Sequence, residues 1–323
     1  MSTLGRLGEF ELIRRIATRA AALGTPEIIL GIGDDAAILR PRKGEDLVVT
    51  TDALVENTHF RFHNQAATTI GRRALLVNLS DLAAMGARPV GFTLALTAPP
   101  SLSLARIDGF LTGLLREAKT YACPLIGGNL SRARETCLSL TVVGAVKRSR
   151  ALLRGAARPG DRIFVTGTLG GAALALAKSR RRGAKLRHLP TPRIAAGRAL
   201  ARMQHPGAVI DLSDGFEADL GHVLRASGVG AAIDVARIPT PRGFASACAK
   251  QKLDAIHTAL RSGEDYELLF TLRQADAKRT SAAALSRRLG VQVSEVGRIT
   301  KSRGVVGLPR GAPGVKTKGF RHF

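Results

Sequence analysis

The stretch Gly31-Ile32-Gly33-Asp34-Asp35-Ala36-Ala37 places two adjacent carboxylates directly after a Gly-x-Gly turn. Neighbouring side chains on an extended strand point to opposite faces, so a regular strand could not aim both carboxylates at one point, whereas a glycine-containing turn can. Two carboxylates held close together raise each other's pKa unless a cation lies between them, and a hard divalent cation bound by oxygens is the simplest partner. Taken alone, the stretch fits a loop with two solvated acids equally well.

The composition indicates a globular protein with a large core. The chain has 323 residues, of which 45% are hydrophobic, which suits two domains or one large one. The sequence contains neither an apolar run of membrane-spanning length nor a secretory hydrophobic segment, so we expect a cytoplasmic protein without a membrane partner. Cys123, Cys137 and Cys248 lack metal-ligand spacing and favour a reducing compartment.

The net charge of +24 raises a second hypothesis, a basic nucleic-acid-binding or scaffold protein. The basic residues are scattered, and their densest cluster, at 178–187, is typical of a helix end that runs into a solvated loop. Aromatic residues make up only 4% and there is no Trp, so basic patches with interleaved stacking rings are missing. We therefore expect no specific nucleic-acid partner, and a charge that helps to attract anionic substrates such as nucleotides.

Hydrophobic periodicity predicts alternating helices and strands, which indicates an α/β protein. A polar, turn-rich connector at 154–161 predicts a boundary between a domain at 1–150 and a second at 151–323. Helices are predicted at 8–23, 68–86, 103–121, 172–178, 191–203, 217–226 and 275–289, and strands at 28–32, 46–52, 90–96, 124–126, 138–146, 162–168, 208–211 and 291–299. Within 262–272, an acidic loop is predicted to lead into a further strand.

Acidic residues are few, 25 against 49 basic ones, yet they collect where strands are predicted to end. Besides Asp34 and Asp35, such sites are Thr50-Thr51-Asp52, Asp211-Leu212-Ser213-Asp214 and Glu264-Asp265. Asn78 and Asp81 share one face of a predicted apolar helix, where a buried polar pair needs partners. The alternative is that the end of this helix is partly exposed and Asp81 is solvated. Asp214 could also simply cap a helix. Clustered carboxylates beside glycines and hydroxyls indicate several Mg²⁺ ions that bridge polyphosphate oxygens.

Two glycine-rich segments could approach a ligand. Gly127-Gly128 follows a short predicted strand, and paired glycines let a backbone come close to a ligand. The segment 162–178 reads as a strand, a Gly170-Gly171 turn and a helix, which is a general anion-binding arrangement. It is not a Walker A loop, because no Gly-Lys-Ser/Thr follows the turn.

An ordered set of motifs, from about residue 5 to the C-terminus, resembles the thiamine-monophosphate kinase family. The motifs are GEFELI at 8–13, GDDAA at 33–37, TDALVE at 51–56, HF at 59–60, NLSDLAAMGA at 78–87, DLSDG at 211–215 and GEDYEL at 263–268. The resemblance implies the two-domain fold of the aminoimidazole ribonucleotide synthetase-like superfamily: an N-terminal α/β domain that pairs strands across a homodimer, and a C-terminal α/β sandwich. It also implies ATP-dependent phosphorylation of thiamine monophosphate to thiamine diphosphate.

The resemblance further implies which residues would bind each ligand. Several Mg²⁺ ions would be held by Asp34, Asp35, Thr50, Thr51, Asp52, Asp81, Asn129, Asp211 and Asp214. ATP would face Gly128, Asn129, Arg154 and Ser213, and thiamine monophosphate would contact His59, Glu264 and Phe320. No side chain is expected to act as a catalytic acid or base, because positioning and metal ions carry the reaction.

Two positions depart from the family pattern. Asn129 stands where the family usually has the Asp of a Gly-Gly-Asp motif, and Phe320 stands where it tends to have a Trp. The amide oxygen of Asn129 brings no charge to a metal, and a phenyl ring stacks less strongly than indole on a cationic thiazolium. Other ATP-using members of the superfamily fit less well: selenophosphate synthetases would show an N-terminal Cys and Lys, whereas the first cysteine here is Cys123.

Overall fold

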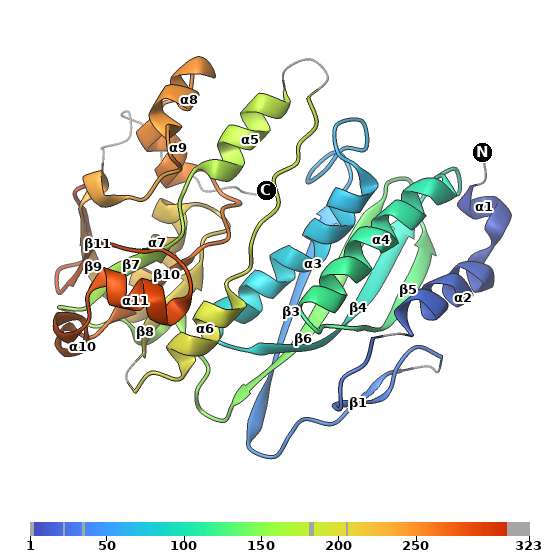
Figure 1. The fold of residues 1–323 in the computed structure, drawn as a ribbon, viewed down its shortest axis with the longest axis horizontal. Coiled ribbons are helices and arrows are strands. Elements are labelled where there is room, and N and C mark those ends of the chain that lie inside the picture. The colour runs from blue at the N-terminus through green and yellow to red at the C-terminus, as the bar shows by residue number, and fades with distance from the viewer. Residues whose placement is uncertain (1–2, 22, 34–35, 181–183, 205, 309–323) are drawn as a thin grey trace. The chain divides into compact units, whose positions relative to one another are not determined.

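The computed structural model describes residues 3–21, 23–33, 36–180, 184–204 and 206–308 (Figure 1). The chain divides into two compact units. Unit 1 comprises Met1–Leu82, Arg88–Ser149 and Gly183–Leu189, and unit 2 comprises Ala83–Ala87, Arg150–Arg182 and Pro190–Phe323. None of the helices in the described ranges combines the length and the apolar character needed to cross a bilayer.

Unit 1 is built on a four-stranded sheet with the order β3-β6-β4-β5. The strands are β3 (Glu45–Val55), β4 (Arg88–Ala98), β5 (Leu125–Arg132) and β6 (Cys137–Lys147). The β3–β6 and β6–β4 pairs are antiparallel, and β4 and β5 are parallel. β3 is therefore an edge strand, with only one neighbour in the sheet.

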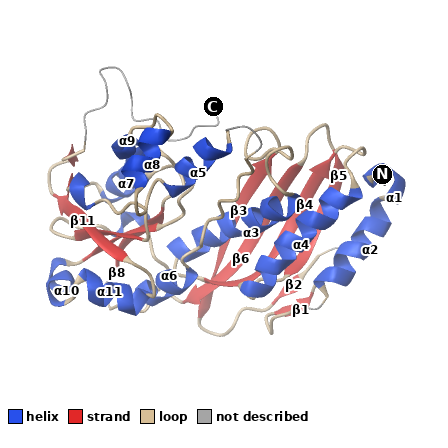
Figure 2. Cartoon of the chain, turned by 45° about the horizontal axis from the view of Figure 1, so that its top comes forward, coloured by secondary structure: helices blue, strands red, loops and turns tan. Residues whose placement is uncertain are grey.

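Helices α3 (Ala67–Ala84) and α4 (Leu104–Thr120) cover one face of this sheet (Figure 2). Leu75, Leu79 and Leu82 of α3 are fully buried, as expected for a helix between a sheet and a second helix. Gly71 and Gly113 let the two helices touch, because a Cβ at either position would overlap the backbone of the other helix. The close packing fixes α3, and with it Asp81, over the sheet.

Further elements complete unit 1. They are α1 (Leu4–Leu7), α2 (Glu9–Ala20) and the antiparallel pair β1 (Ile28–Leu30) and β2 (Ile38–Leu39). The predicted amphipathic helix at 8–23 corresponds to α2. Arg15 of α2 donates a 2.8 Å hydrogen bond from Nε to Asp108 of α4, which joins these two helices.

Unit 2 contains a six-stranded sheet with the order β12-β9-β11-β7-β10-β8. Every pair in it is antiparallel except β12–β9. The strands are β7 (Arg162–Thr166), β8 (Pro206–Asp211), β9 (Gly230–Ile233), β10 (Leu268–Leu272), β11 (Val293–Thr300) and β12 (Gly304–Val306). The core lies between this sheet and helices, and β10 is buried along its whole length.

The helices of unit 2 flank or support the loops that contain the predicted site residues. They are α5 (Gly171–Ser179), α6 (Ile194–Ala201), α7 (Phe216–Ser227), α8 (Phe244–Lys250), α9 (Ala255–Arg261), α10 (Gln274–Arg279) and α11 (Ala282–Leu289). The described part of unit 2 also contains two short 3₁₀ helices, η1 (Arg154–Ala156) and η2 (Val235–Arg237).

Three predictions on the elements were wrong. The helix expected at 275–289 is two helices, because Ser281 accepts a hydrogen bond from the Ala284 amide and starts α11 as its N-cap. The strand expected at 46–52 continues to Val55, because its ladder with β6 runs on to Cys137. The strand expected at 124–126 is longer, so Gly127 and Gly128 lie inside β5 instead of after it, and a Cβ at Gly128 would overlap the Leu94 carbonyl of β4.

Candidate active site

In unit 1, Thr50 and Asp81 meet across the sheet-helix interface. The Thr50 hydroxyl of β3 donates a 2.6 Å hydrogen bond to Oδ2 of Asp81 on α3. Asp52 is two residues further along β3, so it lies on the same helix-covered face as Thr50, and it is exposed. One hydroxyl and two carboxylates thus form an oxygen-rich group on this face of the sheet, although Thr50 and Asp81 are 31 positions apart in the sequence.

Thr51 does not join this group, because neighbouring residues of a strand face opposite ways. Its hydroxyl donates to the Leu140 carbonyl at 2.9 Å and accepts from the Thr141 hydroxyl at 3.3 Å. The prediction that Thr50, Thr51 and Asp52 lie at a strand end was also wrong, since all three lie within β3.

Asn78 lies one turn before Asp81 on the same face of α3 and is fully buried. Its side-chain amide donates to the Ala74 carbonyl at 2.9 Å, which orients its Oδ1 away from that carbonyl. Oδ1 has no hydrogen-bond partner among the described residues. A buried acceptor without a donor is costly, so this oxygen is suited to a bound water or cation.

Gly128 and Asn129 lie on β5, at the opposite edge of the sheet from β3. Cross-strand pairing aligns Asp52 with Leu140 and Asn129 with Ala95, which sets Asn129 on the opposite face from Asp52. The Asn129 side-chain amide donates to the Ser131 hydroxyl at 2.9 Å. Within one chain, the structure therefore does not bring Asn129 to the group formed by Thr50, Asp52 and Asp81.

His59 lies on the turn that follows β3. Its Nδ1 accepts a 3.0 Å hydrogen bond from the Val55 amide, and its own carbonyl accepts a 2.7 Å bond from Arg73. Because Nδ1 is an acceptor here, the neutral ring carries its proton on Nε2. The backbone bonds to Nδ1 and to the carbonyl thus fix the position and orientation of His59.

In unit 2, the segment 211–215 joins β8 to α7. Asp211 ends β8 and is 3% exposed, while Ser213 and Asp214 are half-buried. The N-cap of α7 is Gly215, which has a φ of 111° and has no side chain that could cap the helix. Asp214 therefore does not cap α7, and its carboxylate is available for another role.

Asp219 and His222 on α7 complete the surroundings of Asp214. Oδ2 of Asp219 accepts from the amides of Asp214 at 3.0 Å and Gly215 at 3.1 Å. Burial raises the pKa of Asp219 to about 7, against the lowering effect of these amides. Burial and Arg225 lower the pKa of His222. Ligand atoms of Asp214, Asp219 and His222 lie within 4.8 Å of one another.

Asp219 and His222 are not among the site residues predicted from the sequence. An available signal was the carboxylate in the first turn of the helix that follows the acidic segment, since such a carboxylate reaches back to free amides. Arg154, predicted to face ATP, lies in η1, which packs against α7, and its charge acts on both Asp219 and His222.

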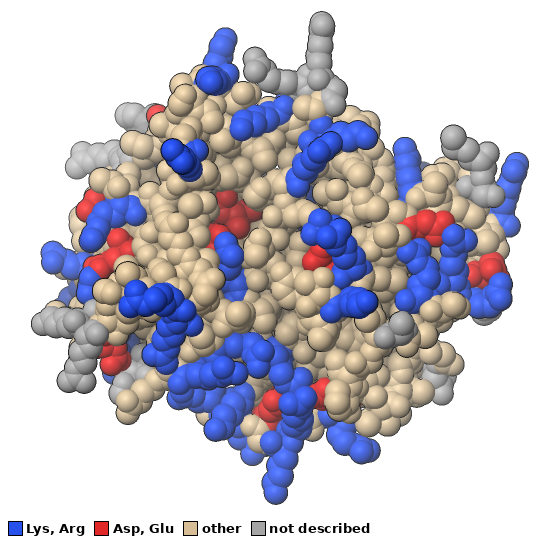
Figure 3. Space-filling model, viewed as in Figure 1, with Lys and Arg blue, Asp and Glu red and all other residues tan. Residues whose placement is uncertain are grey.

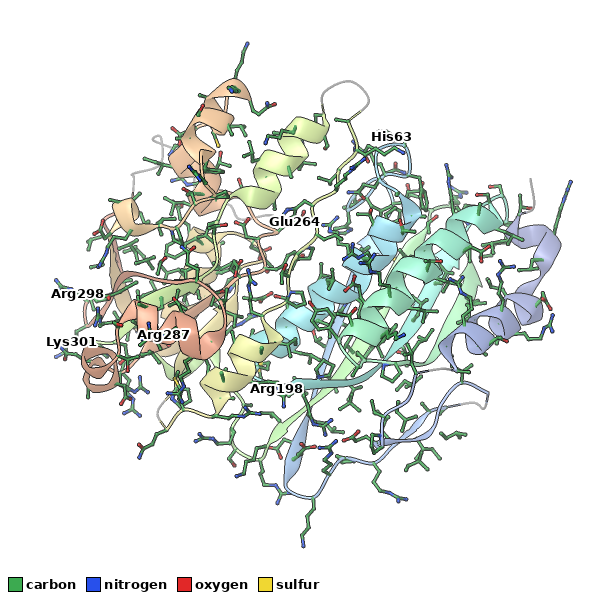
Figure 4. The ribbon with its side chains drawn as sticks, viewed as in Figure 1. His63, Arg198, Glu264, Arg287, Arg298 and Lys301 are labelled. Carbon is green, nitrogen blue, oxygen red and sulfur yellow. The ribbon has the colours of Figure 1, made fainter. Side chains whose placement is uncertain are left out.

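The two acidic segments of unit 2 lie side by side. The Ser213 carbonyl accepts a 2.8 Å hydrogen bond from the Glu264 amide, and the Leu212 carbonyl accepts a 2.9 Å bond from the Tyr266 amide. Gly263 has no room for a Cβ, which would overlap the Ser213 carbonyl. Glu264, labelled in Figure 4, thus lies on a loop fixed directly against Ser213.

Asp265 lies at the N-terminus of α5. Its Oδ2 accepts from the Gly170 amide at 2.7 Å and its Oδ1 from the Ala172 amide at 3.3 Å. Burial raises the pKa of Asp265 to about 7, although these amides lower it. The glycine turn before α5 does bind an anion, as its pattern indicates, but the anion is a carboxylate of the same chain.

Three predicted site residues, Asp34, Asp35 and Phe320, lie outside the described residues. Of the other predicted residues, six fall into two groups. One holds Thr50, Asp52 and Asp81, and the other holds Ser213, Asp214 and Glu264 on adjoining loops.

Comparisons with known proteins decide the family. The model of the AIR synthase related protein N-terminal domain matches residues 33–146, and that of the C-terminal domain matches residues 158–308. The thiamine-monophosphate kinase of Escherichia coli strain K12 is 39% identical over 331 residues, which cover 98% of each chain. The chain belongs to the thiamine-monophosphate kinase family.

Solved structures of relatives agree with this assignment. The crystal structure of the thiamine-monophosphate kinase from Stenotrophomonas maltophilia K279a is similar with a TM-score of 0.80 and 39% identity, covering 92% of this chain and 96% of that one. AaThiL complexed with AMPPCP and TMP is similar with a TM-score of 0.74 and 30% identity, over 100% of this chain and 99% of that one. The expected family and two-domain fold are thereby confirmed.

Proposed function

We propose that this protein transfers the γ-phosphoryl group of ATP to the phosphate of thiamine monophosphate, which gives thiamine diphosphate and ADP. The observation that carries the proposal is the similarity, over the whole chain, to AaThiL complexed with AMPPCP and TMP. The two groups of carboxylates on the chain suit the chemistry, because Mg²⁺ ions held by carboxylates can bridge to the phosphate oxygens of both substrates. Phosphoryl transfer depends mostly on positioning and charge neutralisation.

The residues present fit several Mg²⁺ ions. Thr50, Asp52 and Asp81 offer only oxygen ligands, and the buried Oδ1 of Asn78 adds an acceptor that the described chain leaves without a partner. We propose that Mg²⁺ is held by Asp34, Asp35, Thr50, Asp52, Asp81, Asp211 and Asp214. When bound, Mg²⁺ neutralises phosphate oxygens and stabilises the charge of the transferring group.

The acceptor oxygen belongs to a phosphate and is already anionic, so the reaction needs little help from a general base. Arg154 and Ser213 are proposed to bind ATP, together with Gly128 and Asn129 from β5. Asn129 and Thr51 stay proposed ligands, although one chain alone does not place them with Thr50 and Asp81. Each would therefore have to bind its ligand together with side chains other than those of Thr50 and Asp81.

We propose that thiamine monophosphate contacts His59, Glu264 and Phe320. The Nε2–H of His59 is a donor suited to a phosphate oxygen, because Nδ1 already accepts from Val55. A carboxylate repels a phosphate, so Glu264 is assigned to the cationic thiazolium or to the amino group of the pyrimidine. Phe320 would stack on the thiazolium.

We further propose a cytoplasmic homodimer in which residues 1–150 bind metal and ATP and pair strands across the dimer, and residues 151–323 complete the nucleotide and substrate sites. The edge strand β3 supports strand pairing, because it exposes Val49 (62%) and Leu47 (46%) beside backbone groups that lack a second neighbouring strand. We expect neither a membrane nor a specific nucleic acid among the partners. Lys and Arg occur across the whole visible face in Figure 3.

An assay with ATP, Mg²⁺ and either thiamine monophosphate or thiamine tests the function. We expect thiamine diphosphate from the monophosphate and no phosphorylated product from thiamine. No turnover of either compound, combined with tight and salt-dependent binding of DNA, would replace this proposal with the nucleic-acid-binding alternative.

A further inference from the structure

The turn at 263–266 has an unusual backbone. Glu264 has a φ of 70° and Tyr266 a φ of 52°, so both side-chain-bearing residues adopt the left-handed region that glycine favours. Such residues persist only where their surroundings determine the conformation, and they are concentrated at functional sites. Asp265 lies between the two and has an ordinary φ.

Backbone hydrogen bonds hold both ends of this turn. The amides of Glu264 and Tyr266 donate to the carbonyls of Ser213 and Leu212, at 2.8 and 2.9 Å. These bonds fix the turn relative to the segment that carries Asp214. They leave the middle of the turn to be held by the side chain of Asp265.

Asp265 provides that attachment with both carboxylate oxygens, which accept from Gly170 and Ala172 at the start of α5. The start of α5, which donates these two bonds, is itself tightly packed. Gly170 has a φ of 85°, and a Cβ there would overlap the ring of Phe244, which is 3% exposed. The strained turn is therefore fastened on two sides, to the 212–213 segment and to α5.

We propose that Asp265 is a positioning residue for thiamine monophosphate binding: its carboxylate fastens the 263–266 turn to α5 and so fixes where Glu264 meets the substrate. The inference rests on the proposed function, because it takes Glu264 as a residue that contacts thiamine monophosphate. It adds a role for a residue that does not itself touch the substrate.

The test is steady-state kinetics on four proteins: wild type, Glu264→Gln, Asp265→Asn and the double variant. We expect each single change to raise the KM for thiamine monophosphate about tenfold and to leave the KM for ATP within about twofold. Because Asp265 acts through Glu264, the double variant should exceed Glu264→Gln by no more than about twofold. Asp254→Asn is a matched control, since Asp254 likewise accepts from a helix amide, that of His257 at 2.6 Å, at the start of α9.

If the two changes act independently, the KM for thiamine monophosphate of the double variant rises about 100-fold, and this result would overturn the positioning role. An equal rise of the KM values for thiamine monophosphate and ATP in Asp265→Asn would also overturn it. If Asp265→Asn does not fold, Asp265→Ser keeps one oxygen acceptor and is measured in the same way. A wild-type protein that does not phosphorylate thiamine monophosphate would overturn the proposed function. An active wild type whose Asp265→Asn variant keeps a normal KM for thiamine monophosphate would overturn only the role of Asp265.

Discussion

The carboxylates of the two units are held in opposite ways. In unit 1, Asp52 is exposed on an edge strand, and Asp81 is held by the side-chain hydroxyl of Thr50. In unit 2, Asp219 and Asp265 are enclosed by protein and bind backbone amides at or next to helix N-termini. Asp52 and Asp81 are proposed metal ligands, whereas Asp219 and Asp265 shape the loops around the proposed ligands Asp214 and Glu264 of unit 2.

The largest expected effect is on the carboxylates proposed as metal ligands. Asp52→Ala or Asp211→Ala should lower kcat about 10²-fold or more, the size of effect seen when an electrostatic stabiliser is removed. The measurement is turnover of thiamine monophosphate at saturating Mg²⁺. Asp46→Ala, on the same strand β3, is the control and should stay near normal, because Asp46 accepts from the Ser149 amide and pairs with the exposed Arg148. Near-normal turnover of Asp52→Ala would contradict the assignment.

The next effect concerns stability and pH. The folded-state pKa of Asp265 is about 7 and lies above its ordinary value of 3.8. The contribution of Asp265 to the free energy of unfolding is therefore fully present below about pH 4 and is lost as pH rises through 7. Relative to wild type, Asp265→Asn should therefore gain about 2–3 kcal/mol of unfolding free energy between pH 5 and 8. Urea unfolding without ligands at several pH values measures this. A difference between the two proteins that does not change with pH would show that Asp265 titrates normally.

Asp219→Ala should raise the half-saturating Mg²⁺ concentration about tenfold, as is usual when a residue that orients a metal ligand is lost. The reason is that the amides of Asp214 and Gly215 lose their acceptor. Mg²⁺ titrations of activity provide the measurement. An unchanged Mg²⁺ requirement in a folded variant would mean that the 211–215 segment holds its shape without Asp219.

The smallest effect is expected at Thr50. Thr50→Val keeps the shape of the side chain but removes the hydrogen bond to Asp81, which contributes about 1 kcal/mol, so kcat should fall about fivefold. Thr51→Val is measured beside it, because Thr51, also a proposed ligand, lies on the other face of β3, where its hydroxyl bonds to Leu140 and Thr141. A larger loss in Thr51→Val than in Thr50→Val would reverse the distinction between the two faces.

Much of the fold follows from local sequence, and the site follows less completely. The periodicity at 68–86 predicts α3 well, and the helix predicted at 217–226 matches α7 to within one residue at each end, because apolar spacing is a local requirement. That Thr51 and Asn129 face away from Thr50 depends on strand length and sheet order, which are set by pairing between distant strands. The sequence also indicated an anion site before α5 but not that Asp265, 95 residues away from Gly170, would fill it.

Phosphorus-31 NMR of the reaction with thiamine monophosphate, ATP and Mg²⁺ tests the central claim most directly. The account predicts that the resonance of the monophosphate is replaced by the two resonances of a diphosphate ester, with one ADP formed for each. Formation of ADP with inorganic phosphate alone, or of ADP at the same rate without thiamine monophosphate, would contradict it.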